Sequence, residues 1–126
     1  MVEQFRDIDI ESRIQTSKKF LKKFPNRIPV LVKPGNGVTP AIDNYKYLVP
    51  ANLKVSEFVH IIRERVKLNS TKAMFLFVNN TLPPNSSTMR EIYEQHADQD
   101  GFLYVTYSLE NTFGSNFTFK IFEFIE

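Results

Sequence analysis

The order of apolar patterns along the chain constrains its fold more than any other feature. Two short strand-like segments, Arg27–Lys33 and Tyr45–Val49, flank the loop Pro34–Pro40, whose Pro, Gly and Asn residues are typical of turns. Pro29 indicates that the first strand lies at a sheet edge or begins nearby, because proline cannot donate to a ladder. Pro50 predicts the end of the second strand.

A helix follows this pair, and two further strands come after it. Ser56 is a suitable N-cap for a helix that runs to about Leu68. Its apolar residues form two adjacent stripes, of which one is expected to pack on a sheet and the other to stay partly available. The first stripe holds Val59, Ile62 and Val66, and the second holds Phe58, Ile61 and Arg65. Ala73–Val78 and Phe102–Tyr107 are predicted strands, and Thr88–Gln95 is a predicted short helix.

The N-terminal segment adds helical structure to this core. Apolar residues at helical spacing predict a helix over residues 11–23, ended by Pro25, and a shorter turn near residues 3–8. Two strands, a helix across them and further strands are typical of an α+β fold of the β-grasp type. The length of 126 residues suits one domain.

Composition excludes several classes of protein. The chain has no Cys, which excludes a disulfide scaffold, a thiolate nucleophile and a Cys-ligated zinc site. No phosphate-binding loop, dinucleotide motif or nucleophile elbow occurs, so we expect neither an enzyme nor a cofactor. His60 and His96 stand apart in the sequence, and no metal site is expected.

Charge and hydropathy bear on partners and location. The net charge is only +2, which disfavours nucleic acid as a partner. Residues 1–27 hold seven of the sixteen Lys and Arg against four acids, so a nucleic-acid-binding protein with a basic face remains an alternative. Its affinity for nucleic acid would be unchanged by Leu48→Ala. No signal peptide or apolar run of about 20 residues is visible. We therefore expect a soluble, cytoplasmic protein that is monomeric in solution.

Several sequence blocks resemble a known family, the autophagy ubiquitin-like modifiers of the GABARAP and microtubule-associated protein light chain 3 type. The blocks are Phe24–Val30, Lys46–Ala51, Phe77–Pro84, Asp100–Ser108 and Glu110–Gly114. The resemblance implies a ubiquitin-like β-grasp with two additional N-terminal helices. It divides the chain into an N-terminal helical extension (1–26), a ubiquitin-like domain (27–114) and a propeptide-like tail (115–126).

The resemblance also implies a conjugation pathway. A processing cysteine protease would cut between Gly114 and Ser115, and activating and conjugating enzymes would transfer the Gly114 carboxylate to phosphatidylethanolamine. The product would lie on autophagosome or vesicle membranes. A glycine suits this step because it has no Cβ to obstruct a narrow enzyme channel. The alternative is an unconjugated cytosolic adaptor in vesicle traffic or microtubule attachment.

The second implied activity is recognition of cargo receptors that carry a short aromatic-x-x-aliphatic motif. Such a peptide would add a strand to an exposed sheet edge. The resemblance assigns the aromatic pocket to Phe20, Pro29, Leu31, Lys46, Leu48 and Phe102. It assigns the aliphatic pocket to Tyr47, Val49, Pro50, Leu53, Phe58, Ile61 and Arg65. Lys19, Arg27 and Lys46 would pair with acidic residues that flank the motif.

The chain departs from the family in three places. Thr16 stands where many relatives have an acid, and Lys33–Pro40 is unusually rich in Gly and Pro. The tail Ser115–Glu126 is apolar, and its Phe122–Ile125 segment itself matches aromatic-x-x-aliphatic. We interpret the tail as a propeptide; the alternatives are an extra strand, or a segment that occupies a peptide groove before its removal.

Overall fold

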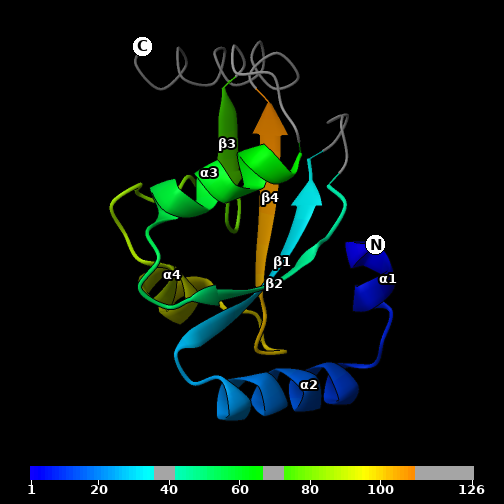
Figure 1. The fold of residues 1–126 in the computed structure, drawn as a ribbon. Coiled ribbons are helices and arrows are strands. Elements are labelled where there is room, and N and C mark those ends of the chain that lie inside the picture. Colours follow the sequence, from blue (N-terminus) through cyan, green and yellow to red (C-terminus); the bar gives the residue numbers. More distant parts are fainter. Residues whose placement is uncertain (36–41, 67–72, 110–126) are drawn as a thin grey trace, which may run out of the picture.

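The computed structural model describes residues 1–35, 42–66 and 73–109. Its elements follow the predicted order (Figure 1). They are α1 (Val2–Arg6), α2 (Ile10–Lys23), β1 (Arg27–Pro34), β2 (Lys46–Pro50), α3 (Val55–Arg65), β3 (Met74–Phe77), α4 (Met89–His96) and β4 (Leu103–Leu109). The α+β, ubiquitin-like architecture with N-terminal helices is confirmed.

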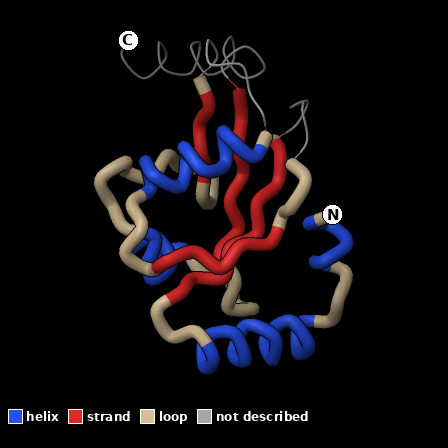
Figure 2. The backbone as a smooth tube through the Cα atoms, in the orientation of Figure 1, coloured by secondary structure: helices blue, strands red, loops and turns tan. Residues whose placement is uncertain are grey.

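The four strands form one mixed sheet in the order β2-β1-β4-β3. β1 pairs antiparallel with β2 and parallel with β4, and β3 pairs antiparallel with β4. β2 and β3 are thus the outer strands of the described sheet. Helix α3 crosses one face of the sheet, while α1 and α2 lie beyond its other face and lower end (Figures 1 and 2).

Both faces of the sheet bury apolar side chains, in accordance with the two-residue repeat of a strand. On β1, Val30 and Val32 point into a large core beneath α3, whereas Leu31 points into a smaller cluster with Val2 and Phe5 of α1. On β4, Leu103 and Val105 belong to the large core, whereas Tyr104 packs against the smaller cluster. Burial on two faces explains why the central strands show continuous apolar runs.

Pro29 suggested either a sheet edge or a strand start. The sheet edge is wrong, because β1 lies between β2 and β4, whereas the strand start agrees with β1, which begins at Arg27. Pro29 is opposite Leu48, while the amide of Val32 donates to the Tyr45 carbonyl 2.9 Å away. Hydrogen-bonded pairs alternate along an antiparallel ladder, so Pro29 occupies a pair that exchanges no bond with β2. Its missing N–H also precedes the first β1–β4 pair, which begins at Val30.

Helix α3 begins at Val55, so the predicted Ser56 N-cap is wrong; the position before the helix is Lys54. The Lys54 amide donates to the Glu57 carboxylate at 2.9 Å. The amides of Val55 and Ser56 donate to the carbonyls of Ser87 and Asn85, at 2.9 and 3.1 Å. A loop distant in sequence thus satisfies the amides that a helix start leaves unpaired. The predicted extension to Leu68 passes beyond the described residues.

Both predicted stripes of α3 contribute to the core. Phe58 of one stripe and Ile62 of the other are completely buried, whereas Val59 is only half-buried. The short helix predicted over Thr88–Gln95 is present as α4, and Thr88 caps it by accepting a hydrogen bond from the Glu91 amide at 3.2 Å. Helix α2 is capped by Asp9, whose carboxylate accepts a hydrogen bond from the Ser12 amide at 2.9 Å.

Candidate functional site

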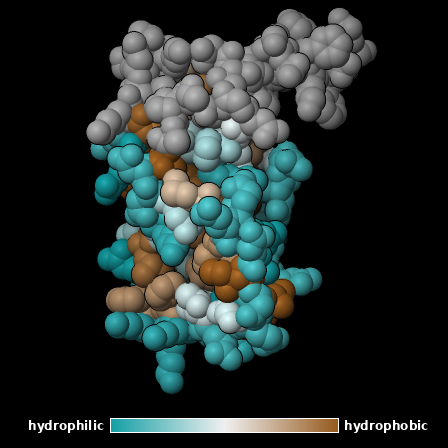
Figure 3. All heavy atoms as spheres, turned by 90° about the vertical axis from the view of Figure 1, so that its right-hand side faces the viewer, coloured by the Kyte–Doolittle hydropathy of each residue, from teal (hydrophilic) through white to brown (hydrophobic). Residues whose placement is uncertain are grey.

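An apolar pocket of about 270 Å³ lies between the N-terminal helices and the edge strand β2. Its lining comprises Phe5, Thr16, Phe20, Pro29, Val30, Leu31, Lys46, Tyr47, Leu48 and Phe102. All six residues that the resemblance assigned to an aromatic pocket are therefore brought together here. Seen from the side of α1, apolar residues form separate patches among hydrophilic ones (Figure 3).

Aromatic side chains from three elements support this pocket. The Phe102 ring meets Phe5 edge-on, with centroids 5.0 Å apart, and meets Phe20 edge-on at 6.5 Å. Edge-to-face packing is the preferred arrangement of such rings. The Lys46 ammonium lies 5.9 Å from the Phe5 ring centroid and 5.3 Å from that of Tyr45, within cation–π range. The pocket thus has aromatic walls and a cation at its rim.

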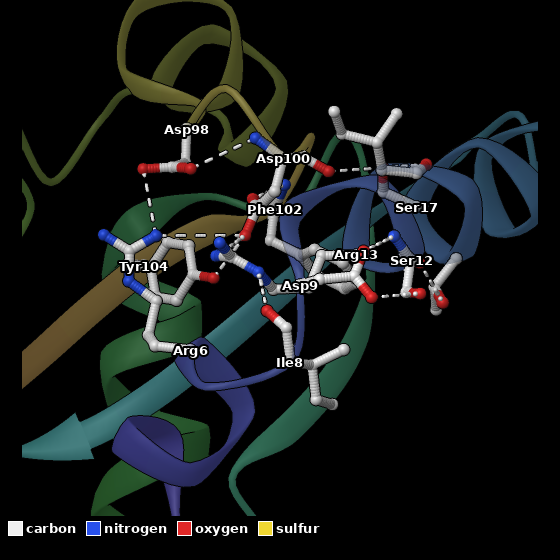
Figure 4. A network of polar contacts seen from close by, with 12 residues as sticks. Arg6, Ile8, Asp9, Ser12, Arg13, Ser17, Asp98, Asp100, Phe102 and Tyr104 are labelled. Carbon is white, nitrogen blue, oxygen red and sulfur yellow. Dashed lines mark hydrogen bonds and ion pairs between the residues drawn. The ribbon is translucent and has the colours of Figure 1, made fainter.

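A buried carboxylate, Asp100, fastens the N-terminal helices beside the pocket (Figure 4). Its side chain has no exposed surface, and one oxygen accepts from the Arg13 guanidinium at 2.9 Å and from the Tyr104 hydroxyl at 2.5 Å. The other oxygen accepts from the Phe102 amide at 2.9 Å. Arg6 lies 3.9 Å from the same carboxylate and 3.3 Å from Asp98. One side chain therefore connects α1, α2 and β4.

Tyr104 shares this environment, and its ring lies 4.3 Å beneath the Arg6 guanidinium. Burial, and then the hydrogen bond to Asp100, raise the pKa of Tyr104 to about 12. Both causes favour the neutral hydroxyl, because a phenolate would be desolvated and would face a carboxylate. Tyr104 is thus held as a hydrogen-bond donor.

Close backbone contact completes the attachment of α2. The Ser17 hydroxyl donates to the Asp100 carbonyl at 2.6 Å. The next residue, Gly101, has φ +87°, and a Cβ there would lie 2.2 Å from the Ser17 hydroxyl oxygen. Glycine satisfies both the backbone conformation and the lack of space. The Asp-Gly turn therefore positions α2 over the sheet.

The residues assigned to the aliphatic pocket are divided between surface and core. Val49 and Phe58 are 5% and 0% exposed, whereas Tyr47 and Leu53 pack half-buried against that core. The assigned residues Pro50 and Arg65 are exposed, and Ile61 is half-buried. The Tyr47 and Phe58 rings meet edge-on, with centroids 6.0 Å apart.

Tyr47 also carries an unusual polar atom. Its hydroxyl is buried and has no hydrogen-bond partner in the described part of the chain. Burial raises the pKa of Tyr47. Leaving such a hydroxyl unpaired costs about 1–3 kcal/mol.

The three assigned cations lie at the periphery. Lys19 is exposed on α2, and Lys46 is at the pocket rim. Arg27 is exposed, and its guanidinium donates to the Leu48 carbonyl at 3.0 Å. Gly114, Ser115 and the tail lie outside the described residues, as does most of the loop that follows Pro34.

Sequence reasoning missed several residues of this region. Phe5 and Thr16 line the pocket, and the Thr16 hydroxyl bonds to the Ser12 carbonyl at 2.9 Å rather than reaching across the groove. Asp100 and Arg13 were not assigned a role either. The Asp-Gly pair was a visible turn signal, but nothing in the sequence pairs it with a helix 87 residues away.

A second cavity, of about 560 Å³, lies at the other end of β2. Pro50 and Asn52 contribute from the end of that strand, Arg27 from β1, and Thr88 and Arg90 from the start of α4. The Arg90 guanidinium donates to the Pro25 carbonyl at 3.3 Å. No lining residue is acidic.

Two classes of feature are not found in the described ranges. None of their helices has the length and apolarity needed to cross a bilayer. They also contain no group of three or more His, Asp or Glu side chains that could hold a metal ion.

Comparison with known proteins agrees with this geometry. Residues 12–114 match the family described as "Autophagy protein Atg8 ubiquitin like". Autophagy-related protein 8a of Arabidopsis thaliana is 55% identical over 107 residues, which cover 84% of this chain and 88% of the relative. Autophagy-related protein 8 of Kluyveromyces lactis is 51% identical over 115 residues, covering 90% and 93%.

A solved structure shows the same fold. The crystal structure of Trypanosoma brucei ATG8 superposes with a TM-score of 0.78 at 36% identity, covering 83% of this chain and 91% of the other. The sequence blocks, the sheet topology and the pocket beside its edge strand lead to one conclusion. This chain belongs to the Atg8 family of ubiquitin-like autophagy proteins.

Proposed function

We propose that this ubiquitin-like autophagy protein recruits cargo receptors through the groove beside β2 while attached to a membrane. The observation that carries the recognition step is the apolar pocket next to an outer strand of the described sheet. An extended peptide can pair with such a strand and insert an apolar anchor into the adjoining pocket. The pocket's aromatic walls and Lys46 suit an aromatic anchor.

The residue assignment also sets the direction of the peptide. The pocket for the aromatic residue includes Lys46 and Leu48, whereas Val49, Pro50 and Leu53 of the aliphatic subsite lie at or beyond the end of β2. The aromatic residue comes first in the motif, so the bound peptide runs parallel to β2. The aliphatic anchor rests on Tyr47, Leu53 and Ile61, with Val49 and Phe58 supporting that surface from the core.

Membrane attachment is proposed to require cleavage after Gly114. Hydrolysis of the Gly114–Ser115 peptide bond frees a carboxylate, which enzymes of the pathway activate and join to the amine of phosphatidylethanolamine. The family match covers residues 12–114, so it supports the separation of the tail 115–126. The division between residues 1–26 and 27–114 is part of the proposal. The chain provides the tail and the binding surface, and the chemistry belongs to its partner enzymes.

Binding is tested with a synthetic peptide that carries a Trp-x-x-Leu motif and neutral flanks. We expect Phe20→Ala and Leu48→Ala to weaken binding at least about tenfold, as for anchor-pocket residues at other interfaces. Gln95→Ala, an exposed change on α4, is the matched control. Unchanged affinity in both pocket variants would refute the groove as the recognition site.

Processing is tested by the intact mass after incubation with a family processing protease. We expect loss of residues 115–126 from the wild type and no loss from Gly114→Ala. A wild type that stays uncut, with a protease shown to be active on a relative, would favour the unconjugated adaptor. RNA binding that weakens with salt and is unchanged in Leu48→Ala would favour the nucleic-acid-binding alternative.

A further inference from the structure

Side chains of the protein itself form hydrogen bonds with the outer edge of β2 in the described sheet. The Asn44 carboxamide donates to the Lys46 carbonyl at 2.9 Å and accepts from the Lys46 amide at 3.2 Å. The Arg27 guanidinium donates to the Leu48 carbonyl at 3.0 Å. These three backbone groups belong to the strand that the proposed peptide must join.

The register shows that these groups face away from the sheet. The Tyr45 carbonyl accepts from Val32 of β1, and paired residues on the two strands follow a constant register up to Pro50. Alternation then turns Tyr47 and Val49 toward β1, and turns Lys46 and Leu48 toward the open side. The residue opposite Leu48 is Pro29, which has no N–H to offer.

Asn44 thus imitates the hydrogen bonds of a neighbouring strand. One donor and one acceptor on a single amide meet both backbone groups of Lys46. A peptide parallel to β2 needs the Lys46 and Leu48 carbonyls as acceptors for its amides, and both already have donors. Covered edges of this kind also protect a sheet against indiscriminate strand pairing.

We propose that Asn44, assisted by Arg27, is a removable cap on the β2 edge that determines which peptides can bind. This inference rests on the proposed groove function and adds a selectivity element to it. A peptide must displace the cap before it can pair with β2. Anchors that fill the pocket provide the free energy for this displacement, whereas an extended peptide without anchors does not.

The test compares the wild type with Asn44→Ala and Asn44→Asp in the full chain, using the neutral Trp-x-x-Leu peptide. Alanine removes both cap bonds, and aspartate replaces the donor to the Lys46 carbonyl with a repelling oxygen. We expect both variants to bind about threefold to tenfold tighter, since each net hydrogen bond contributes about 0.5–1.5 kcal/mol. The association rate should rise as well, with Gln95→Ala as the control.

Amide exchange provides a readout that does not depend on the peptide. In Asn44→Ala the Lys46 amide should exchange faster, while the Tyr47 and Val49 amides that face β1 keep their protection. Unchanged or weaker peptide binding in both Asn44 variants would overturn the cap. Failure of the groove itself would give a different result: Phe20→Ala and Leu48→Ala would then bind the peptide as tightly as the wild type does.

Discussion

The two faces of the sheet are stabilised in different ways. Beneath α3, nineteen of the described residues form one buried apolar cluster. On the side of α1 and α2, the corresponding cluster has four buried residues, and polar contacts centred on the buried Asp100 carboxylate add to the attachment. The first face distributes its stability over many contacts. The second concentrates it on Asp100 and leaves apolar surface available for a ligand.

The largest effect on stability is expected at Asp100, because this one buried side chain contacts residues of α1, α2 and β4. Asp100→Ala would leave Arg13 without its buried partner and should lower the free energy of unfolding by about 3–5 kcal/mol. Urea denaturation measures the loss, and amide exchange should show α2 losing protection before β4. Asp98→Ala is the comparison variant and should cost less, since its ion pair with Arg6 is partly exposed and it accepts one hydrogen bond from the Asp100 amide at 3.1 Å. A similar loss in both variants would show that the stability of this face is not concentrated on Asp100.

Truncating one core side chain under α3 should lower the free energy of unfolding strongly and leave peptide affinity nearly unchanged. Ile62 has no exposed surface, and Ile62→Ala should cost about 2–5 kcal/mol through lost burial and a new cavity. Ile61→Ala, at a half-buried neighbour, should cost less in the same denaturation experiment. Peptide affinity of the folded Ile62→Ala protein should remain near that of wild type. A tenfold loss of affinity would show that this core also shapes the aliphatic subsite that Phe58 supports.

Alkaline pH should weaken the α2 face through Tyr104. The pKa of Tyr104 is raised to about 12 in the folded state, from an ordinary value of 10.0. The folded protein then binds more protons between these values, so its stability falls as pH rises through this window. Tyr104→Phe should show a shallower decline in unfolding free energy from pH 10 to 12. Equal slopes in the two proteins would contradict the role of Tyr104, whereas their difference should stay constant below pH 9.

The smallest effect is expected on the outer surface of α3. His60 and Glu64 form an exposed pair at 3.0 Å, with side chains 72% and 70% exposed. His60→Ala should change the unfolding free energy by no more than about 1 kcal/mol, as for other exposed pairs. Thermal denaturation of this variant beside Ile62→Ala would measure the contrast within one helix. A loss comparable to that of Ile62→Ala would show that burial does not control this element.

The difference between the faces also explains which parts of the fold were predictable. Strands β1 and β4 were recognisable because apolar residues on both faces give continuous runs, and the predicted short helix Thr88–Gln95 lies within one residue of α4. The start of α3 was predicted wrongly, and of the two positions that Pro29 suggested, the sheet edge was wrong. Both depend on partners distant in sequence, the carbonyls of Asn85 and Ser87 and the neighbouring strand β4.

The candidate site was predictable to a similar extent. Phe20, Leu48 and Phe102 could be assigned together through the family resemblance, and the structure brings them around one pocket. The contributions of Phe5 and Thr16 required the positions of α1 and α2. The edge cap of Asn44 is local in sequence, but its significance depends on β2 being an outer strand of the described sheet.

By itself, the sequence determined the order of helices and strands, the family and the apolar residues available for a core. These properties follow from local periodicity, turn chemistry and motifs, which a linear chain displays directly. Only the tertiary structure decided which strands are outermost in the described sheet, which side chains hydrogen-bond to β2 and how Asp100 joins three elements. Burial and pairing across long sequence separations set these properties, because a carboxylate or a backbone amide acquires its energetic role from the groups that fold against it.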